Sequence, residues 1–366
     1  MITTSGFKQE IQKLGKSSIL LGNRSMPLQL VLFVTSRCNM RCDHCFYLDE
    51  INDSSRTELS IEQIETLAKE LGGLNWVALS GGEPYLRKDL VEIKQAFYKH
   101  SRPNIMSHVT NGYYPDRISD MTGKMAASCS KSKVLVIFSL DGLQETHDQI
   151  RHSPGSFDLV RESIQSVQKH QSDYPNLETG VVITAQDNNQ EELIPLIEYI
   201  ESKLMPDGIY INLHRDHTQP SNVIVDSQVL MRYQEAVTFY ESIRTKKNLK
   251  GRKLLDRLLD GKNKLQKRTI AKIAEENTYQ LPCLAGKVSV VVDELGNVYA
   301  CELLKDPMGN LKNQSFKEIW FSEQARRLSD SITQHKCYCT HECAMSSSLL
   351  FNPGKLFQSM ISGVMT

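Results

Sequence analysis

Short apolar runs alternate with amphipathic stretches between residues 28 and 214 of the chain. Apolar runs of five to seven residues are typical of buried strands, and apolar positions three and four residues apart are typical of helices. The first amphipathic stretch starts at a capping box formed by Ser60 and Gln63 and runs to Leu71. The predicted strands are Leu28–Val34, Trp76–Ser80, Ile105–Thr110, Val134–Leu140, Gly180–Thr184 and Ile209–Leu213, and the further predicted helices are 89–99, 115–127, 156–170 and 191–203.

This alternation predicts a parallel α/β sheet. Strands separated by helices pair in parallel through right-handed crossovers. A complete eight-stranded barrel needs roughly 250 residues, whereas the six repeats end at about residue 214. We therefore expect an open six-stranded (β/α)6 partial TIM barrel.

The rest of the chain follows a different pattern. Residues 226–276 read as helices, and the run Val288–Val292, a turn at 294–297 and the return run Val298–Cys301 predict a β-hairpin. At 366 residues the chain exceeds the size at which one core usually stops growing. We expect an N-terminal extension (1–27), the barrel (28–220), a helical connecting segment (221–278) and a small hairpin-containing domain (279–366).

Composition and charge narrow the class of protein. Lysine plus arginine and aspartate plus glutamate both total 43, so the net charge gives no reason to expect nucleic acid or a membrane surface as a partner. The apolar stretches 19–21 and 356–365 are too short for a signal segment or a membrane span. The nine cysteines are more typical of metal ligands or catalytic thiols than of disulfides. We expect a cytoplasmic protein.

The helical segment contains a basic stretch. Between Arg244 and Lys272 there are twelve basic residues and only two acidic ones, Asp256 and Asp260. One interpretation is a solvated helical face that covers a packed apolar stripe. The other is a docking surface for an anionic substrate or a carrier protein.

Cys38, Cys42 and Cys45 carry the strongest chemical signal. They lie in the loop after the first predicted strand. Three thiolates in one short loop can hold a cubane iron–sulfur cluster, which usually has four cysteine ligands, so that the fourth iron stays open to a small molecule. The alternatives are a zinc site that uses His44 as a fourth ligand, or a set of buried thiols.

Polar residues follow most of the other predicted strands. In parallel folds, ligands gather at the C-terminal ends of the strands. The segment Ser80–Pro84 follows the second strand, Asn111 the third, Ser139 and Asp141 the fourth, and the segment 214–217 the sixth. Two glycines in the first of these segments would let backbone approach a ligand, although an ordinary glycine turn would look the same.

The Cys-x3-Cys-x2-Cys loop and the Gly81-Gly82-Glu83-Pro84 segment together resemble the radical S-adenosylmethionine (radical SAM) superfamily. The resemblance implies the partial barrel, a [4Fe–4S] cluster on Cys38, Cys42 and Cys45, and S-adenosylmethionine (SAM) with its methionine part at Gly81–Pro84. It also implies reductive cleavage of SAM to a 5′-deoxyadenosyl radical that abstracts hydrogen from a substrate. An external low-potential electron donor is the implied partner.

Further residues match positions that contact SAM in this superfamily. Ser139 and Asp141 form a Ser-x-Asp-Gly segment that suits the adenosyl sugar, and Asn111 is a further candidate cofactor contact. Arg151 ends a His-Asp-x-x-Arg segment, and its planar guanidinium suits the methionine carboxylate, with a structural ion pair as the alternative. The candidate catalytic acid–base residues are His214, Asp216 and His217, with a solvated loop as the alternative.

The C-terminal cysteines resemble those of the SPASM and twitch domains that follow radical SAM barrels. Gly296 and Cys301 fit the opening pattern of these domains. A full SPASM domain usually has seven or more cysteines, whereas this region has five: Cys283, Cys301, Cys337, Cys339 and Cys343. We therefore expect one auxiliary iron–sulfur cluster, of the [4Fe–4S] type, with one of the last three cysteines spare. A zinc ribbon is the alternative, and Cys129 is expected to be an ordinary thiol.

An auxiliary cluster beside the active site favours a net oxidation, because it can accept an electron from a substrate radical. The segment before the barrel is too short for a winged-helix peptide-recognition domain, which favours a small sugar-like or other biosynthetic metabolite as the substrate. A peptide- or protein-modifying maturase of the ribosomal-peptide or sulfatase type is the alternative. A third interpretation is a non-catalytic binding protein stabilised by zinc or a cluster.

Overall fold

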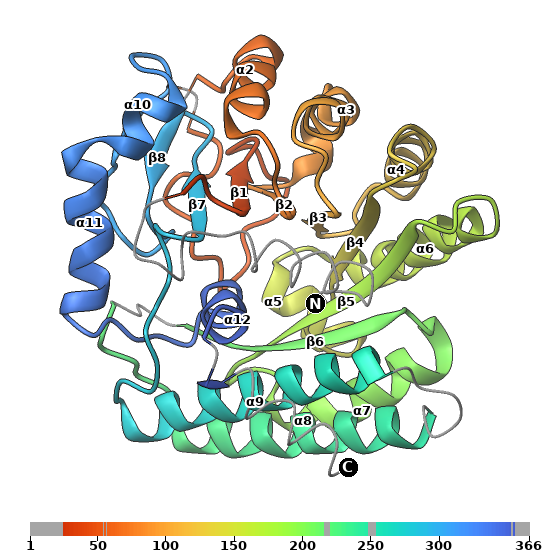
Figure 1. The fold of residues 1–366 in the computed structure, drawn as a ribbon. Helices are drawn as coiled ribbons and strands as arrows, with labels where there is room; N and C mark the ends of the chain where they lie inside the picture. Colours follow the sequence, from red (N-terminus) through yellow and green to blue (C-terminus); the bar gives the residue numbers. More distant parts are fainter. Residues whose placement is uncertain are drawn as a thin grey trace.

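The computed structural model describes residues 25–53, 55, 57–215, 220–247, 254–352 and 354–355. In this part of the chain nine strands form one curved sheet in the order β6-β5-β4-β3-β2-β1-β7-β8-β9 (Figure 1). Neighbours from β6 to β7 pair in parallel, and the last two pairs are antiparallel. The strands are β1 (Gln29–Phe33), β2 (Trp76–Ser80), β3 (Ile105–Thr110), β4 (Lys133–Ser139), β5 (Leu177–Ala185), β6 (Gly208–Leu213), β7 (Ser289–Val292), β8 (Asn297–Tyr299) and β9 (Gly309–Asn310).

The helices cover the outer face of this sheet and its open side. In Figure 1, the helices α2, α3, α4 and α6 lie outside the strands, and α8 and α9 run beside β6. The capping box that the sequence predicts at the start of α2 is confirmed: Ser60 Oγ accepts from Gln63 N at 3.3 Å, and Gln63 Oε1 accepts from Ser60 N at 2.9 Å. The helices are α2 (Ile61–Leu71), α3 (Leu90–His100), α4 (Pro115–Ser128), α5 (Gln144–Arg151), α6 (Ser156–Gln168), α7 (Leu193–Tyr199), α8 (Ser227–Lys247), α9 (Leu254–Glu276), α10 (Phe316–Phe321), α11 (Glu323–Gln334) and α12 (Glu342–Leu350).

Successive residues of a strand point in turn toward the outer helices and toward the barrel interior. In β2, Val77 and Leu79 are buried in the core. Their neighbours Trp76, Ala78 and Ser80 line a cavity inside the barrel. This period of two follows from the pleat, which points successive side chains to opposite faces of a sheet.

The C-terminal hairpin continues the barrel sheet. β7 pairs with β1 in the register Gln29↔Ser289 to Leu32↔Val292. Tyr47 OH donates to a carboxylate oxygen of Glu294, and Leu59 N donates to the carbonyl oxygen of Glu294 at 2.8 Å. The predicted barrel and the predicted small domain therefore share one hydrogen-bonded sheet.

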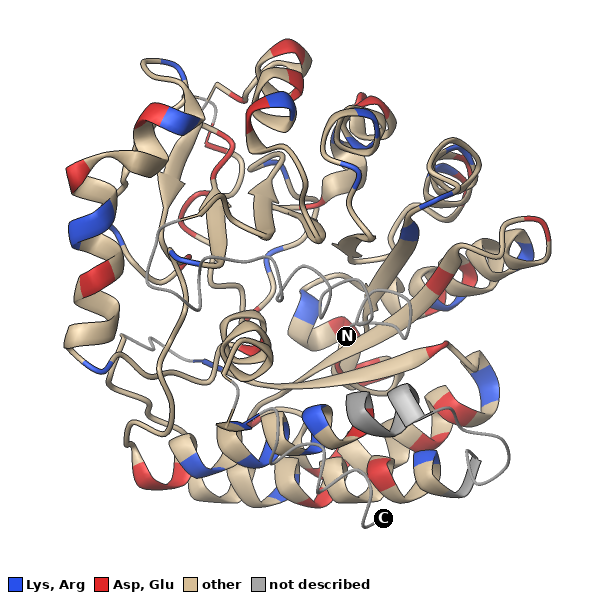
Figure 2. Cartoon of the chain, in the orientation of Figure 1, with Lys and Arg blue, Asp and Glu red and all other residues tan. Residues whose placement is uncertain are grey.

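The surface carries charges of both signs. Acidic and basic residues are mixed along the outer helices and along α8 and α9 (Figure 2). Arg244 lies 3.6 Å from Asp260, and Lys272 lies 3.8 Å from Glu276. The first of these pairs joins α8 to α9, and the second lies within α9. The apolar stripe expected at Leu254, Leu255, Leu258 and Leu259 lies outside the described side chains.

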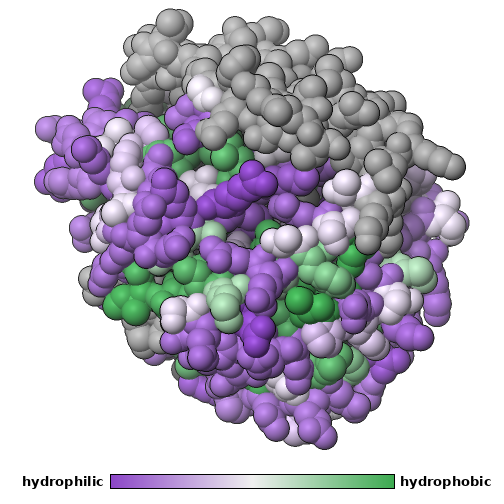
Figure 3. Space-filling model, turned by 90° about the horizontal axis from the view of Figure 1, so that it is seen from below, coloured by the Kyte–Doolittle hydropathy of each residue, from purple (hydrophilic) through white to green (hydrophobic). Residues whose placement is uncertain are grey.

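Hydrophobic patches interrupt the hydrophilic face of the molecule seen in Figure 3. Exposed large apolar residues include Met205, Ile224 and Met231, and scattered exposures of this kind are normal for folded proteins. Among the residues that the structure describes, no helix combines the length and the apolar composition that a membrane span requires. The predicted extension up to residue 24 and the segment 356–366 lie outside the described residues.

Candidate functional site

The loop that carries Cys38, Cys42 and Cys45 packs directly against the Gly-Gly-Glu-Pro turn after β2. Gly82 N donates to Thr35 O at 2.9 Å, and Glu83 N donates to Arg37 O at 2.8 Å. A Cβ atom on Gly82 would lie 2.3 Å from Arg37 O, and one on Gly81 would lie 2.3 Å from Thr35 O. The sequence assigns these glycines to the approach of a ligand, but in the structure the backbone that needs the space belongs to the cysteine loop.

Glu83 joins the ends of β2 and β3. Its carboxylate accepts from Tyr85 N at 3.1 Å, from Thr110 Oγ1 at 2.9 Å and from Asn111 N at 2.8 Å. Burial raises the pKa of Glu83 to about 7, although these hydrogen bonds act in the opposite direction. The Asn111 side chain in turn donates to Asn39 Oδ1 at 2.9 Å, so the end of β3 also contacts the cysteine loop.

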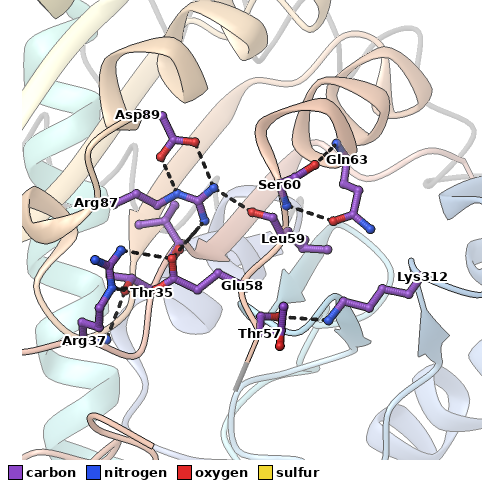
Figure 4. A network of polar contacts seen from close by, with 11 residues as sticks. Thr35, Arg37, Thr57, Glu58, Leu59, Ser60, Gln63, Arg87, Asp89 and Lys312 are labelled. Carbon is purple, nitrogen blue, oxygen red and sulfur yellow. Dashed lines mark hydrogen bonds and ion pairs between the residues drawn. The ribbon is translucent and has the colours of Figure 1, made fainter. Parts of the chain in front are cut away.

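A polar network holds the start of the cysteine loop (Figure 4). Buried Arg87 donates to the carbonyl oxygens of Val34 and Leu59, both at 2.7 Å. Glu58 accepts from Thr35 and pairs with Arg37, whose Nη2 lies 3.1 Å from Glu58 Oε2. The sequence does not single out Arg87 or Glu58, because nothing in their local pattern separates them from surface charges.

Asp141 and Arg151 form a buried ion pair beside the cysteine loop. Asp141 Oδ2 accepts from Arg151, Asp141 Oδ1 accepts from Thr184 N at 2.8 Å, and Arg151 Nη1 lies 3.4 Å from Cys42 Sγ. Burial acts to raise the pKa of Asp141, but the Arg151 charge and the smaller effects of neighbouring groups together outweigh it, and the pKa falls to about 2. The structure therefore shows the ion pair that the sequence left as an alternative, and it places that pair against Cys42. Ser139 ends β4 and is buried.

The rings of His44 and His214 meet in a T-shaped arrangement beside Asp141. Their ring centroids are 6.3 Å apart, and His44 Nε2 lies 3.7 Å from Asp141 Oδ2. Burial lowers the pKa of His44 to about 4, so this ring is neutral near pH 7. Of the predicted catalytic residues, only His214 is described; Asp216 and His217 lie outside the described residues.

Two adjoining cavities lie next to these residues. The first, which we name the mouth cavity, has a volume of about 770 Å³ and lies between residues 43–50 of the cysteine loop and residues 293–305 of the hairpin region. The second, which we name the lumen cavity, has a volume of about 240 Å³ and lies among the barrel strands, α9 and α12. Both are lined by Phe46, Arg215 and Glu302, so they meet at these three residues.

Phe46 and Arg215 are in contact where the two cavities meet. The Arg215 guanidinium lies 5.8 Å from the Phe46 ring centroid and 3.5 Å from Glu302 Oε1. Phe46 directly follows Cys45 and is 56% exposed, because it faces the cavities rather than the core. An exposed aromatic ring in a concave site offers a contact for an apolar group. Sequence reasoning did not identify Phe46 or Glu302.

The buried thiols need a cation beside them in order to ionise. Burial raises the pKa of Cys38 to about 12, and it raises those of Cys337 and Cys339 to about 11. Buried thiols become thiolates beside a cation, which a bound iron–sulfur cluster supplies. Near the cysteine loop, Asn39 Nδ2, His44 Nδ1 and Arg151 Nε are buried without a hydrogen-bond partner among the described residues. Such atoms are available to the polar groups of a cofactor.

No three His, Cys, Asp or Glu side chains within the described ranges are grouped so that they could hold a single metal ion. In a cubane cluster each thiolate binds a different iron, so its ligands stand farther apart than those of a single ion.

Two families of known proteins match the chain. The radical SAM superfamily matches residues 32–200, and the SPASM family, described as an iron–sulfur cluster-binding domain, matches residues 283–344.

Several curated relatives resemble the chain. Fe-coproporphyrin III synthase of Methanosarcina barkeri is 29% identical over 192 residues, which cover 52% of this chain and 45% of that protein. The antilisterial bacteriocin subtilosin biosynthesis protein AlbA of Bacillus subtilis is 24% identical over 90% of this chain and 72% of its own length. Mycofactocin maturase MftC of Mycolicibacterium smegmatis is 27% identical over 86% of this chain and 76% of its own length. The match thus spans less than half of the first relative and about three quarters of the other two.

Solved structures share the fold. The structure of anSMEcpe with bound AdoMet has a TM-score of 0.61 at 18% identity and covers 84% of both chains. The structure of Streptococcus suis SuiB bound to S-adenosylmethionine has a TM-score of 0.59 at 16% identity, over 89% of this chain and 72% of that one.

The fold and the cysteine loop at the end of β1 define the class of protein: the chain contains a radical SAM domain at residues 32–200. More particularly, it is a radical SAM protein with a C-terminal SPASM domain. Its cofactors are therefore a [4Fe–4S] cluster, SAM and auxiliary iron–sulfur.

Proposed function

We propose that this radical SAM protein modifies a peptide, which enters through the mouth cavity and places one residue in the lumen cavity. The observation that carries this proposal is the pair of joined cavities, about 770 Å³ and 240 Å³, between the cysteine loop and the SPASM hairpin. AlbA and MftC, matched over most of this chain, are named for bacteriocin biosynthesis and for mycofactocin maturation, and SuiB has been solved with its precursor peptide SuiA. These names favour a peptide over the small sugar-like metabolite that the sequence favours.

We assign the binding of the cluster and of SAM to separate groups of residues. Cys38, Cys42 and Cys45 would hold the [4Fe–4S] cluster, and SAM would lie near the turn at residues 81–84 and Arg151. When bound, the cluster and SAM supply a 5′-deoxyadenosyl radical for hydrogen abstraction, and the auxiliary site supplies an electron acceptor for a net oxidation. Arg151 would keep a fixed positive charge beside this centre, because its guanidinium is paired with Asp141.

The lining residues would orient the substrate and exclude water. Phe46 and the apolar strand residues Val31 and Ala78 would enclose an apolar group in the lumen cavity. His214 lines the mouth cavity and would exchange a proton with the substrate, together with Asp216 or His217. Asn111 and Ser139 remain proposed cofactor contacts.

The test is SAM cleavage after anaerobic reconstitution with iron and sulfide. With dithionite as the reductant, the wild type should release 5′-deoxyadenosine and the Cys38→Ala, Cys42→Ala, Cys45→Ala triple variant should not. Iron should fall from about eight to about four per chain if each site holds one cubane cluster. Cys129→Ala is the matched control, because this thiol is buried among the barrel helices and should leave both values unchanged. A wild type with full iron and no 5′-deoxyadenosine would refute the enzymatic proposal.

A second experiment separates the two substrate classes. Extract of the source cells should raise 5′-deoxyadenosine release, and treating the extract with protease should remove this stimulation if the substrate is a peptide. Stimulation that survives protease treatment would contradict the peptide and favour a small metabolite. A small-metabolite substrate also has support among the relatives, because an AdoMet-dependent heme synthase of Methanosarcina barkeri is 25% identical over 85% of this chain.

A further inference from the structure

The lumen cavity runs along the inside of the barrel from the cysteine-loop end to the starts of the strands. Ser80, the last residue of β2, lines its outer part, and Trp76 and Ile105, the first residues of β2 and β3, line its inner end. The helices α9 and α12 lie on the open side of the barrel beside it (Figure 1). The lumen cavity is therefore a deep site that is reached from the mouth cavity at Phe46.

Two aromatic side chains limit the depth of the lumen cavity. Trp76 Nε1 donates to Ser107 Oγ at 2.7 Å, which ties the indole ring across β2 and β3. Tyr210 of β6 also lines the cavity, and a Cβ atom added at Gly180 would lie only 2.6 Å from ring carbon Cε2 of Tyr210. The tyrosine ring therefore lies against the backbone of β5, where the glycine leaves room for it. Because both rings are held in place, they set how far a bound group can enter.

The barrel wall of the lumen cavity is mostly aliphatic. The strand residues with branched or small apolar side chains in this wall are Val31, Ala78, Ile105, Leu135, Ile137 and Val182. The volume of the cavity is about 240 Å³. An apolar cavity of about 150 Å³ in another protein holds a benzene ring. The lumen cavity therefore has room for a ring that carries a small substituent.

The charged side chains that line the lumen cavity in the described part of the chain have partners in the protein. Arg215 and His341 pair with Glu302, Lys267 pairs with Glu342, and Lys262 donates to Gln266 and Ser346. Moving an ion from water into such a site is costly unless the protein supplies an opposite charge. The lumen cavity therefore favours an uncharged group.

Thr340 offers a polar contact to a group in the lumen cavity. It lines the cavity, is only 2% exposed, and its Oγ1 has no hydrogen-bond partner among the described residues. Buried polar side chains are nearly always hydrogen-bonded in folded proteins. Because a hydroxyl both donates and accepts, an O–H, an N–H or a carbonyl group of a bound molecule would satisfy Thr340.

We propose that the lumen cavity selects an uncharged, ring-sized side chain of the substrate peptide, whose polar atom is hydrogen-bonded to Thr340. Trp76 and Tyr210 form the floor against which this side chain packs. That the group belongs to a peptide rests on the proposed function. Its lack of charge, its size and its polar atom follow from the lining of the cavity itself.

Four small probes test the charge preference. Phenol and toluene have nearly the same size and shape, but only phenol carries a hydroxyl; benzoate and benzylammonium carry a negative and a positive charge. In anaerobic ligand-observed NMR titrations of the reconstituted wild type, phenol and toluene should bind and the two ions should bind at least about tenfold more weakly. Failure of phenol and toluene to bind, or equally tight binding of either ion, would overturn the proposal.

The Thr340→Val variant tests the hydrogen bond, because valine keeps the shape of threonine and lacks its hydroxyl. Its affinity for phenol should fall about two- to tenfold while its affinity for toluene stays unchanged. Thr340→Ser, which keeps a hydroxyl, should retain the affinity for phenol. Iron content measured on each variant shows whether the clusters are intact. Equal losses for phenol and toluene in Thr340→Val, or no loss for phenol, would overturn the role of Thr340.

The Ala78→Leu variant tests the location of the site. The larger side chain fills part of the lumen cavity and should weaken phenol and toluene alike, by about tenfold. Ala127→Leu is the matched control, because Ala127 is exposed on α4, and it should leave both affinities unchanged. Unchanged binding in Ala78→Leu would place the probes elsewhere and overturn the proposal. These titrations do not depend on SAM cleavage, so a failure of the proposed function would be seen separately, in the 5′-deoxyadenosine assay.

Discussion

At the scale of single residues, the site depends on close backbone contacts. The Gly-Gly-Glu-Pro turn and the cysteine loop approach each other without any side chain between them. A glycine is required at Gly82 because the facing atom is a backbone carbonyl oxygen, which cannot rotate away as a flexible side chain would. The same turn thus shapes the loop that carries Cys38.

We expect Gly82→Ala to destabilise the protein and weaken cluster binding. Its new Cβ would lie 2.3 Å from Arg37 O, so the loop must move, and overpacking of this kind costs about 1–3 kcal/mol. Chemical denaturation and iron content would measure the effect. Gly73→Ala is the control, because nothing lies within 4 Å of its Cβ position, and it should change stability by less than about 0.5 kcal/mol. Equal losses in the two variants would contradict this reason for the glycine.

Lys94 is a buried charge that the chemistry of the site does not use. Its Nζ donates to Met106 O at 3.2 Å and lies 2.7 Å from His108 Nδ1, while His108 Nε2 lies 2.7 Å from Tyr85 OH. Burial lowers the pKa of Lys94 to about 7, from 10.5 in the unfolded chain. Between these values the unfolded chain binds more protons than the folded protein, so this residue makes stability rise with pH from about 7 to about 10.

Lys94→Met should remove this dependence. From pH 7 to pH 9 the wild type should gain about 1–3 kcal/mol of unfolding free energy relative to the variant. Denaturation of both proteins at several pH values would measure the difference. Burial raises the pKa of the nearby Cys129 thiol, and this thiol is present in both proteins. A difference that stays constant with pH would show that Lys94 keeps its charge in the folded protein.

At the scale of elements, helix starts are encoded locally. Ser60 begins α2 and Ser315 begins α10, each with a complete capping box. Such caps satisfy backbone N–H groups that have no partner within the helix. The first of them was predictable because all of its atoms lie within four residues.

Ser60→Ala should lower the unfolding free energy by about 1 kcal/mol, because the Gln63 backbone N–H at the start of α2 loses its side-chain acceptor. Thermal or denaturant unfolding would measure this. Ser128→Ala provides a comparison, since Ser128 lies in the last turn of α4, where its hydroxyl donates to Lys124 O at 2.8 Å, and it should cost less. A larger loss at Ser128 would contradict the capping argument.

The strands of the barrel were predictable to within a few residues, and β2 and β3 have the predicted bounds. Their runs of apolar residues identified these strands in the sequence. α5 was not predicted as a separate helix, because its sequence QETHDQIR holds a single aliphatic residue and shows no period. β9 has only two residues, so only its pairing with β8 defines it.

The residues of the candidate site that belong to short sequence motifs could be predicted. The residues that act through contacts between distant segments of the chain could not. The cysteine loop and residues 81–84 could be read directly from their spacing. The Arg87 contacts with Val34 and Leu59 join segments 25 or more residues apart in sequence, and no local pattern records them.

At the scale of the whole molecule, one sheet joins both cysteine groups. β1, which leads into Cys38, lies between β2 and β7, and β7 leads through β8 to Cys301. The ladder of hydrogen bonds between β1 and β7 therefore fixes the distance and orientation of the two halves of the site. Tyr47 and Glu294 add a side-chain contact across the same joint.

A chain divided in the loop between α9 and β7 tests this joint. Residues 1–278 and 279–366, produced together as separate chains, should purify as a complex because β1 and β7 pair. Residues 1–278 alone should aggregate, since the free edge of β1 and the apolar groups under the hairpin become exposed. A soluble, monomeric fragment 1–278 would show that the barrel does not need the hairpin.

The pairing of β1 with β7 also sets an order of events during synthesis. Gln29 and Ser289 are paired neighbours, although 260 residues separate them in the chain. During synthesis, β1 can pair with β2 early. Its other edge stays unpaired until β7, which lies in the last quarter of the chain, has emerged from the ribosome. An unpaired strand edge at this stage is a site for association with other chains. The nascent protein therefore has a long interval in which the edge of β1 is open to association, and the first cysteine loop emerges before the second group of cysteines has been synthesised.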